Sequence, residues 1–154
     1  LFTEIDLSCC INITSSRDSL NGYQKGKFFY CWKGIQFEKS SDGDIVDVDH
    51  FFSHTLLTEL PEANINGVWN FVLACQECNR GTGGKFERIP KIQFLERLHA
   101  RNEYLINSHH PLRETIINQT GKDTSKRIKF LQQMDQKAID IIPTRWSPPE
   151  DHEG

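Results

Sequence analysis

The chain has 154 residues, of which 37% are hydrophobic and 25% are charged, and its formal net charge at pH 7 is −3. This length allows one domain that buries about two-thirds of its unfolded surface, and the composition excludes disordered and membrane-embedded proteins. No apolar run approaches the roughly 20 residues that span a bilayer, and the N-terminus lacks the pattern of a secretory signal. We therefore expect no membrane partner.

The five cysteines are an odd number, with one adjacent pair (Cys9, Cys10) and one Cys-x-x-Cys pair (Cys75, Cys78), besides Cys31. Such spacing is a poor disulfide framework and is more typical of metal binding or free thiols in a reducing compartment. We therefore expect a cytoplasmic protein. Because the chain begins with leucine rather than methionine, a fragment of a longer protein, with an upstream domain missing, is one interpretation.

Charge is unevenly distributed along the chain. Residues 38–62 contain seven acidic residues and one lysine, net −6, whereas residues 80–101 contain six basic and two acidic residues, net +4. An acidic region that holds a cation beside a basic region that holds phosphates is the arrangement that a metal-dependent nuclease needs. Two solvated surfaces are the alternative for either segment alone.

The sequence divides into four segments along the chain. Residues 1–27 carry no clear periodicity and are expected to be a support segment. Residues 28–90 are rich in strand-like blocks and turn residues: an aromatic block at 28–32, a strand at 45–50, a strand at 68–74 and a turn at 75–84. Residues 91–142 show helical periodicity in three pieces, starting at Lys91, Pro111 and Ser125. Residues 143–154 are expected to form an extended or flexible tail. The fold class is α+β.

Two adjacent residues at the end of the strand at 45–50 carry chemistry. The Asp49 carboxylate can ligate a hard cation, and the His50 imidazole has a pKa near 6.5, close enough to neutrality to deprotonate a water. Neighbouring residues on a strand point to opposite faces, so both can serve one site only if the strand ends or bends there. A surface turn is the alternative interpretation of an isolated Asp-His pair.

Two asparagines lie at positions where a side-chain amide can have a specific role. Asn79 directly follows the Cys-x-x-Cys pair, and an amide oxygen is a good neutral ligand for Mg²⁺. Asn70 interrupts an apolar strand and can bond across to the loop that follows His50. A helix cap is the alternative role for Asn79, and a satisfied core amide is the alternative for Asn70.

Cys75 and Cys78 supply half of a zinc site. An upstream partner motif would occupy positions 28 and 31, but only Cys31 can ligate, because Phe28 stands in the place of the other cysteine. Cys9, Cys10 or a histidine could complete the site, or aromatic packing could replace the metal.

Taken together, these residues resemble the HNH (ββα-metal finger) endonuclease family, in its zinc-knuckle branch with one upstream cysteine missing. The resemblance covers residues 28–90 and rests on four elements in order: Cys31, Asp49-His50, the Asn70-Phe71-Val72-Leu73 run, and Cys75 to Asn79. It implies a ββα-metal (HNH/treble-clef-like) core with a helical C-terminal extension over residues 91–142.

The resemblance also implies roles. His50 is the general base, Asp49 and Asn79 ligate one catalytic Mg²⁺ or Mn²⁺, and Asn70 positions the His50 loop. Cys31, Cys75 and Cys78 hold a structural Zn²⁺. Thr82 stands where many members carry a lysine, so contact with the substrate phosphate passes to Arg80 or Lys85.

The implied reaction is attack of water on a phosphodiester bond in DNA, as in a bacterial restriction, defence or phage nuclease. An N-terminal domain or a partner subunit would give target specificity. A homodimer is a further possibility. A zinc-finger-like module that binds nucleic acid without cutting it is the main alternative. A structural or protein-interaction domain with a degenerate knuckle is the third. The enzyme is favoured because all four polar positions of the family pattern are retained while the cysteines are partly lost. These positions are Asp49, His50, Asn70 and Asn79.

Overall fold

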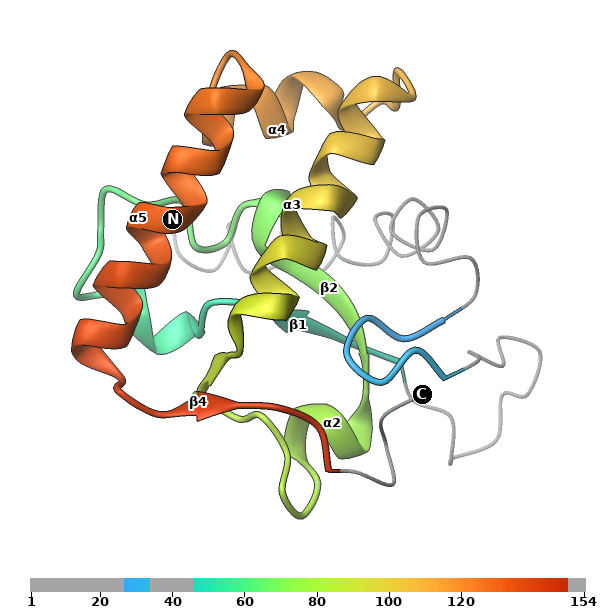
Figure 1. Ribbon diagram of the computed structural model, residues 1–154, viewed down its shortest axis with the longest axis vertical. Helices are drawn as coiled ribbons and strands as arrows, with labels where there is room; N and C mark the ends of the chain where they lie inside the picture. The colour runs from blue at the N-terminus through green and yellow to red at the C-terminus, as the bar shows by residue number, and fades with distance from the viewer. Residues whose placement is uncertain (1–26, 34–45, 150–154) are drawn as a thin grey trace, which may run out of the picture.

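The computed structural model describes residues 27–33 and 46–149, and these ranges form a mixed fold of the α+β class. The helices and strands are arranged in space as Figure 1 shows. In chain order, with η for a 3-10 helix, they are β1 (Val46–His50), η1 (His54–Leu57), η2 (Val68–Asn70), β2 (Phe71–Cys75), α2 (Gln76–Arg80), β3 (Ile89–Pro90), α3 (Ile92–Asn107), α4 (Arg113–Thr120), α5 (Thr124–Ile141) and β4 (Arg145–Trp146).

The strands β1 and β2 form an antiparallel pair whose register runs from Val46 opposite Cys75 to His50 opposite Phe71. The first four residues of β2 are buried, as expected for an apolar strand covered on both faces. The turn at residues 28–33 lies along β2, because the Phe29 amide donates to the Leu73 carbonyl at 2.8 Å. The aromatic block that the sequence predicted as a strand is therefore mostly a turn.

A short helix, α2, follows β2 without a connecting loop, where the sequence predicted only a turn. The Cys75 sulfur accepts a hydrogen bond from the Cys78 amide at 3.3 Å and so caps the first turn of α2. A side-chain acceptor at this position satisfies an amide that has no partner within the helix. The Cys-x-x-Cys spacing thus starts α2 directly at the end of the sheet.

The three longer helices pack together, and Figure 1 shows α3 crossing the β1–β2 pair with α5 running alongside α3. The buried face of α3 includes two polar residues, Arg101 and Asn102. Arg101 is fully buried and donates to the carbonyl oxygens of Phe71 at 2.6 Å and Trp69 at 3.0 Å. These bonds fasten α3 to the beginning of β2. None of the helices in the described ranges is both long and apolar enough to cross a membrane.

The described part of the C-terminal segment, which the sequence predicted as an extended or flexible tail, is extended and packed. Its strand β4 pairs in parallel with β3, and Trp146 is only 2% exposed. The indole packs edge-on against Tyr30 at 5.1 Å and stacks on Phe94 at 6.3 Å between ring centroids. Burial of one large aromatic side chain, which composition alone does not reveal, anchors the segment.

Candidate functional site

Asn70 is completely buried, and its side-chain amide is fully used in hydrogen bonds. Its Oδ1 accepts from the Phe52 amide at 2.8 Å, and its Nδ2 donates to the carbonyl oxygens of Phe52 at 3.0 Å and Ile65 at 2.9 Å. Phe52 lies in the loop that follows His50, and Ile65 lies in the segment that leads into η2. Asn70 therefore ties both segments to the start of β2.

His50 ends β1, and its ring bonds to Asn66 through Nε2, 2.8 Å from the Asn66 Oδ1. An amide oxygen only accepts, so Nε2 carries the hydrogen and the lone pair of the neutral ring is on Nδ1. Burial lowers the pKa of His50 below its usual value of 6.5, so the ring is neutral at pH 7. Such a ring can accept a proton at Nδ1.

Asp49 is buried, and one of its two carboxylate oxygens is occupied. The Tyr30 hydroxyl donates to Oδ2 at 2.9 Å, and the Lys85 ammonium lies 3.3 Å from the same oxygen. Burial raises the pKa of Asp49, and the charge of Lys85 opposes that rise. Within the described residues, no hydrogen bond is made to Oδ1. Oδ2 is therefore fixed by two donors.

Asn79 lies on α2 and faces β1 through Asp47. Its Nδ2 donates to the Asp47 Oδ2 at 2.9 Å, so the Asn79 Oδ1 is oriented as the free acceptor of the amide. The neighbouring Arg80 also reaches Asp47, with its Nε 3.1 Å from the same Oδ2. Half of the Arg80 side chain remains exposed, so its guanidinium can still meet an anion from solvent.

Lys85 lies in the interior, which revises the role that its sequence position suggested. Its side chain is fully buried, and Nζ donates to the His50 carbonyl at 2.8 Å besides pairing with Asp49. A buried ammonium with protein partners is not placed to receive a phosphate from solvent. Lys85 instead connects the loop after α2 to the end of β1.

The structure thus brings the predicted polar residues into one β1–β2–α2 unit, in two groups. Asp49 joins Tyr30 and Lys85, and Asn79 joins Asp47 and Arg80. Among the described residues, no hydrogen bond or ion pair links the His50 ring to Asp49 or Asn79. Adjacent residues of a strand alternate between faces, which accounts for the separate partners of Asp49 and His50.

The three sulfur atoms of Cys31, Cys75 and Cys78 lie within 4.8 Å of one another and could hold a metal ion such as zinc. Cys31 comes from the turn at 28–33, and its sulfur is 3.8 Å from that of Cys75. Hydrogen bonds from the Cys75 and Cys78 thiols lower the pKa of Cys31 to about 3, and the same sharing raises the pKa of the other two. The cluster therefore favours a thiolate, the form that binds metal. Cys9 and Cys10 lie outside the described residues.

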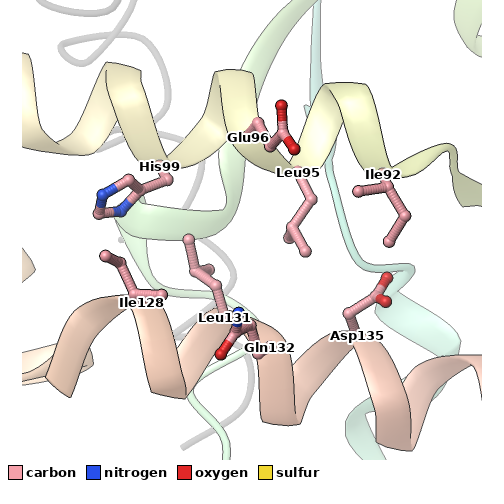
Figure 2. Close-up of a pocket in the computed structure, with 8 residues that line it drawn as sticks. All are labelled: Ile92, Leu95, Glu96, His99, Ile128, Leu131, Gln132 and Asp135. Atoms are coloured by element: carbon pink, nitrogen blue, oxygen red, sulfur yellow. The ribbon is translucent and has the colours of Figure 1, made fainter. Parts of the chain in front are cut away.

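A groove of about 320 Å³ runs between α3 and α5, away from these residues (Figure 2). Leu95 and Leu131 face each other across it, while Glu96 lies at its rim. None of the predicted site residues is among those that line it, which are Ile92, Leu95, Glu96, His99, Ile128, Leu131, Gln132 and Asp135.

Three residues of the site were not identified from the sequence: Tyr30, Asp47 and Asn66. The alternation of β1 contained a signal for Asp47, because residues 47 and 49 share one face of the strand. Tyr30 and Asn66 gave no such signal, since an aromatic block and a loop asparagine are common in structural roles. A comparison of the chain with protein-family models, with curated proteins and with solved structures finds no match.

Proposed function

We propose that this chain is a metal-dependent endonuclease of the HNH (ββα-metal) type that hydrolyses phosphodiester bonds in DNA. The observation that carries the proposal is the His50 ring at the end of β1, which Asn66 holds through Nε2 and whose pKa burial lowers. A general base must be unprotonated and fixed in one tautomer to take a proton from water.

His50 accepts the proton of the attacking water at Nδ1. Nε2 keeps its hydrogen and donates it to the Asn66 Oδ1 in both the neutral and the protonated ring, so the ring keeps its orientation while it gains charge. Asn70 supports this geometry indirectly, because it bonds to both backbone groups of Phe52, two residues beyond the base. Movement of the His50 loop would break those buried bonds.

Asp49 and Asn79 are the proposed ligands of the catalytic cation, and their free atoms suit that role. Each has an oxygen, Oδ1, without a protein donor in the described residues, and hard cations such as Mg²⁺ and Mn²⁺ prefer oxygen ligands. The second atom of each side chain is held by a neighbour: Asp49 by Tyr30 and Lys85, and Asn79 by Asp47. Such outer contacts orient ligands. A cation bound there would stabilise the charge that develops on the leaving oxygen.

The cysteine cluster is proposed to hold a structural Zn²⁺. Metal bound by Cys31, Cys75 and Cys78 would join the turn at 28–33 to both β2 and the first turn of α2, which carries Asn79. Three thiols in this state belong in a reducing compartment, so we place the protein in the cytoplasm. Arg80 is the proposed contact for a phosphate next to the cleaved bond, and a further domain or subunit would select the target.

One observation favours a module that binds nucleic acid without cutting it. The Lys85 ammonium already neutralises Asp49 inside the protein. A cation at Asp49 would therefore meet a nearby positive charge, which weakens its binding. In that case Lys85 would take the place of the metal, and the fold would keep only its contacts with DNA.

Plasmid nicking in Mg²⁺ or Mn²⁺ separates the two functions. We expect the unsubstituted protein to nick and His50→Ala to be at least about 100-fold slower, because general-base catalysis contributes about 10²–10⁴-fold. His109→Ala, in the exposed connection between α3 and α4, is the matched histidine control and should nick normally. Equal cleavage by the unsubstituted protein and His50→Ala would remove the enzymatic claim for this site.

A further inference from the structure

Phe86, in the loop between α2 and β3, is an exposed aromatic residue in a strained backbone conformation. It is 56% exposed, the highest value among the large hydrophobic residues that the structure describes as exposed. Its φ is +48°, in the left-handed region that bulky residues rarely adopt. Single exposed hydrophobic residues are common, but one that is also forced into an unfavourable conformation calls for a reason.

Backbone hydrogen bonds hold Phe86 in this conformation. Its amide donates to the Asn79 carbonyl at 2.8 Å, and the preceding Lys85 amide donates to the Cys78 carbonyl at 2.6 Å. The Lys85 Nζ also lies 3.4 Å from the Phe86 carbonyl. The backbone at Phe86 is thus fastened to the end of α2 and, through Lys85, to His50 and Asp49. The ring itself is exposed to solvent, while hydrogen bonds hold its backbone in place.

The opposite side of the same loop is also fastened. The Trp146 indole donates to the Gly83 carbonyl at 2.8 Å, and Trp146 is itself buried. In Figure 1 the chain after α2 extends as a loop beyond the other elements before it returns to β3. A loop that projects and yet is bonded at both sides presents its side chains with little loss of entropy on binding.

The surroundings of Phe86 fit a nucleic-acid strand. The Arg80 side chain is half exposed, and Arg80 adjoins Asn79, whose carbonyl accepts from the Phe86 amide. Of the charged residues next to Phe86 in the sequence, Lys85 is buried and paired with Asp49 and Glu87 is exposed, so Arg80 supplies the cation on this side of the loop. A strand of DNA presents a phosphate and a flat base in each nucleotide, so a cation and an aromatic ring on neighbouring backbone can contact both.

We propose that Phe86 stacks on a base of the DNA next to the phosphate that is cleaved, and so fixes the strand relative to His50 and Asn79. This inference rests on the proposed function for the identity of the substrate. It adds a contact to a base, whereas the site described above contacts only the phosphate and the water. It also predicts a preference for DNA whose bases are unpaired or easily unstacked.

The test measures DNA binding without cleavage. A His50→Ala protein in Mg²⁺ is titrated into a single-stranded oligonucleotide that contains 2-aminopurine, and into the same oligonucleotide as a duplex. Fluorescence anisotropy of an end label gives the dissociation constant, and 2-aminopurine emission reports whether a base leaves its neighbours. In this background, Phe86→Gly removes the ring and suits the positive φ, so the variant is expected to fold. Phe86→Tyr keeps an aromatic ring.

We expect Phe86→Gly to weaken binding of the single strand by about 5- to 150-fold and to abolish the change in 2-aminopurine emission, the range expected for loss of one base–aromatic stack. Phe86→Tyr should bind within about threefold of the parent on the same scale. Tyr104→Ala is the control for loss of an exposed aromatic elsewhere, since Tyr104 is 44% exposed on α3. It should change neither signal.

Unchanged binding and emission in Phe86→Gly, or absence of DNA binding by the parent, would overturn the inference. The plasmid assay keeps the two proposals apart. Nicking by the unsubstituted protein together with no effect of Phe86→Gly would reject the base contact and retain the nuclease. Binding that depends on Phe86 without any nicking would retain the base contact and reject hydrolysis.

Discussion

At the scale of single residues, the site is organised by buried polar side chains that bond to groups of other segments. Asn70 makes three hydrogen bonds with backbone groups of the two segments that flank η1. Asp49 and Lys85 are likewise paired inside the protein. Removing such a partner leaves a buried polar group unpaired, which costs about 1–3 kcal/mol. Loss of one partner therefore affects several groups together.

Asn70→Ala should lower the free energy of unfolding by about 3–5 kcal/mol, since it leaves both backbone groups of Phe52 and the Ile65 carbonyl without partners. Urea denaturation followed by tryptophan fluorescence measures the change. Asn118→Ala, at an exposed position of α4, is the matched control and should stay within about 0.5 kcal/mol of the parent. Similar losses for both variants would contradict the role of the Asn70 amide.

Nuclease activity should fall as the pH drops through the pKa of His50, which burial holds below 6.5, because the protonated ring cannot accept a proton. The acidic limb of the pH–rate profile then lies below pH 6.5. The bond to Asn66 raises this pKa, so Asn66→Ala should move the limb to lower pH and reduce the plateau rate. Asn66→Asp adds a negative charge and should move the limb to higher pH. Identical limbs in all three proteins would exclude His50 as the base.

At the scale of elements, the cysteine cluster joins the turn at 28–33 to the junction between β2 and α2. The turn is otherwise attached to β2 by the bond between the Phe29 amide and the Leu73 carbonyl. Cys75 has two roles, since its sulfur also caps α2. The short α2 has few residues to stabilise it, and isolated helices of this length do not form in water. Its position therefore depends on the cap and on any metal held by the cluster.

The protein purified with zinc present should contain a single Zn²⁺ per chain, measured by atomic emission, and Cys75→Ser should contain almost none. Metal bound to the folded state alone stabilises it, so EDTA should lower the Tm of the unsubstituted protein. The same treatment of Cys75→Ser serves as the control and should leave its Tm unchanged. If the purified protein contains no zinc and EDTA leaves its Tm unchanged, aromatic packing takes the place of the metal.

At the scale of the whole molecule, the C-terminal segment and the helices keep the site together from outside the β1–β2–α2 unit. Trp146 contacts Tyr30, which donates to Asp49. The Trp146 indole also donates to the Gly83 carbonyl, in the loop that carries Lys85 and Phe86. The segment from 145 to 149 thus supports both the candidate cation ligand and the candidate base contact. Arg101 on α3 supports the same unit at the start of β2.

Trp146→Ala should lower the free energy of unfolding by about 3–5 kcal/mol, the range for removal of a large buried aromatic side chain. It should also reduce nicking more than its effect on stability explains, because it frees the Gly83 loop and Tyr30. Ile141→Ala, 42% exposed at the end of α5, is the control and should cost less than about 1 kcal/mol. The two measurements are urea denaturation and plasmid nicking below the unfolding transition.

Local pattern alone accounts for much of the fold. The apolar alternation of residues 45–50 predicted β1, and the helical periodicity after Pro90 predicted α3, α4 and α5 within a few residues. The start of α5 differs from the prediction: Asp123, whose side chain accepts from the Lys126 amide, caps α5 in place of Ser125. The stretch from Val68 was predicted as one strand, but its first three residues form η2 because Asn70 turns inward to bond the loops.

The sequence by itself determined the α+β class, the position of the three helices and the choice of polar residues on which the proposed function rests. Those properties depend on spacing between near neighbours, which sets the local backbone. Only the tertiary structure decided that Lys85 is buried against Asp49, that Asn66 holds the His50 ring and that Trp146 anchors the tail. Each of these contacts joins residues that are far apart in the sequence or in irregular loops, so it is fixed by the packing of the whole chain rather than by any local pattern.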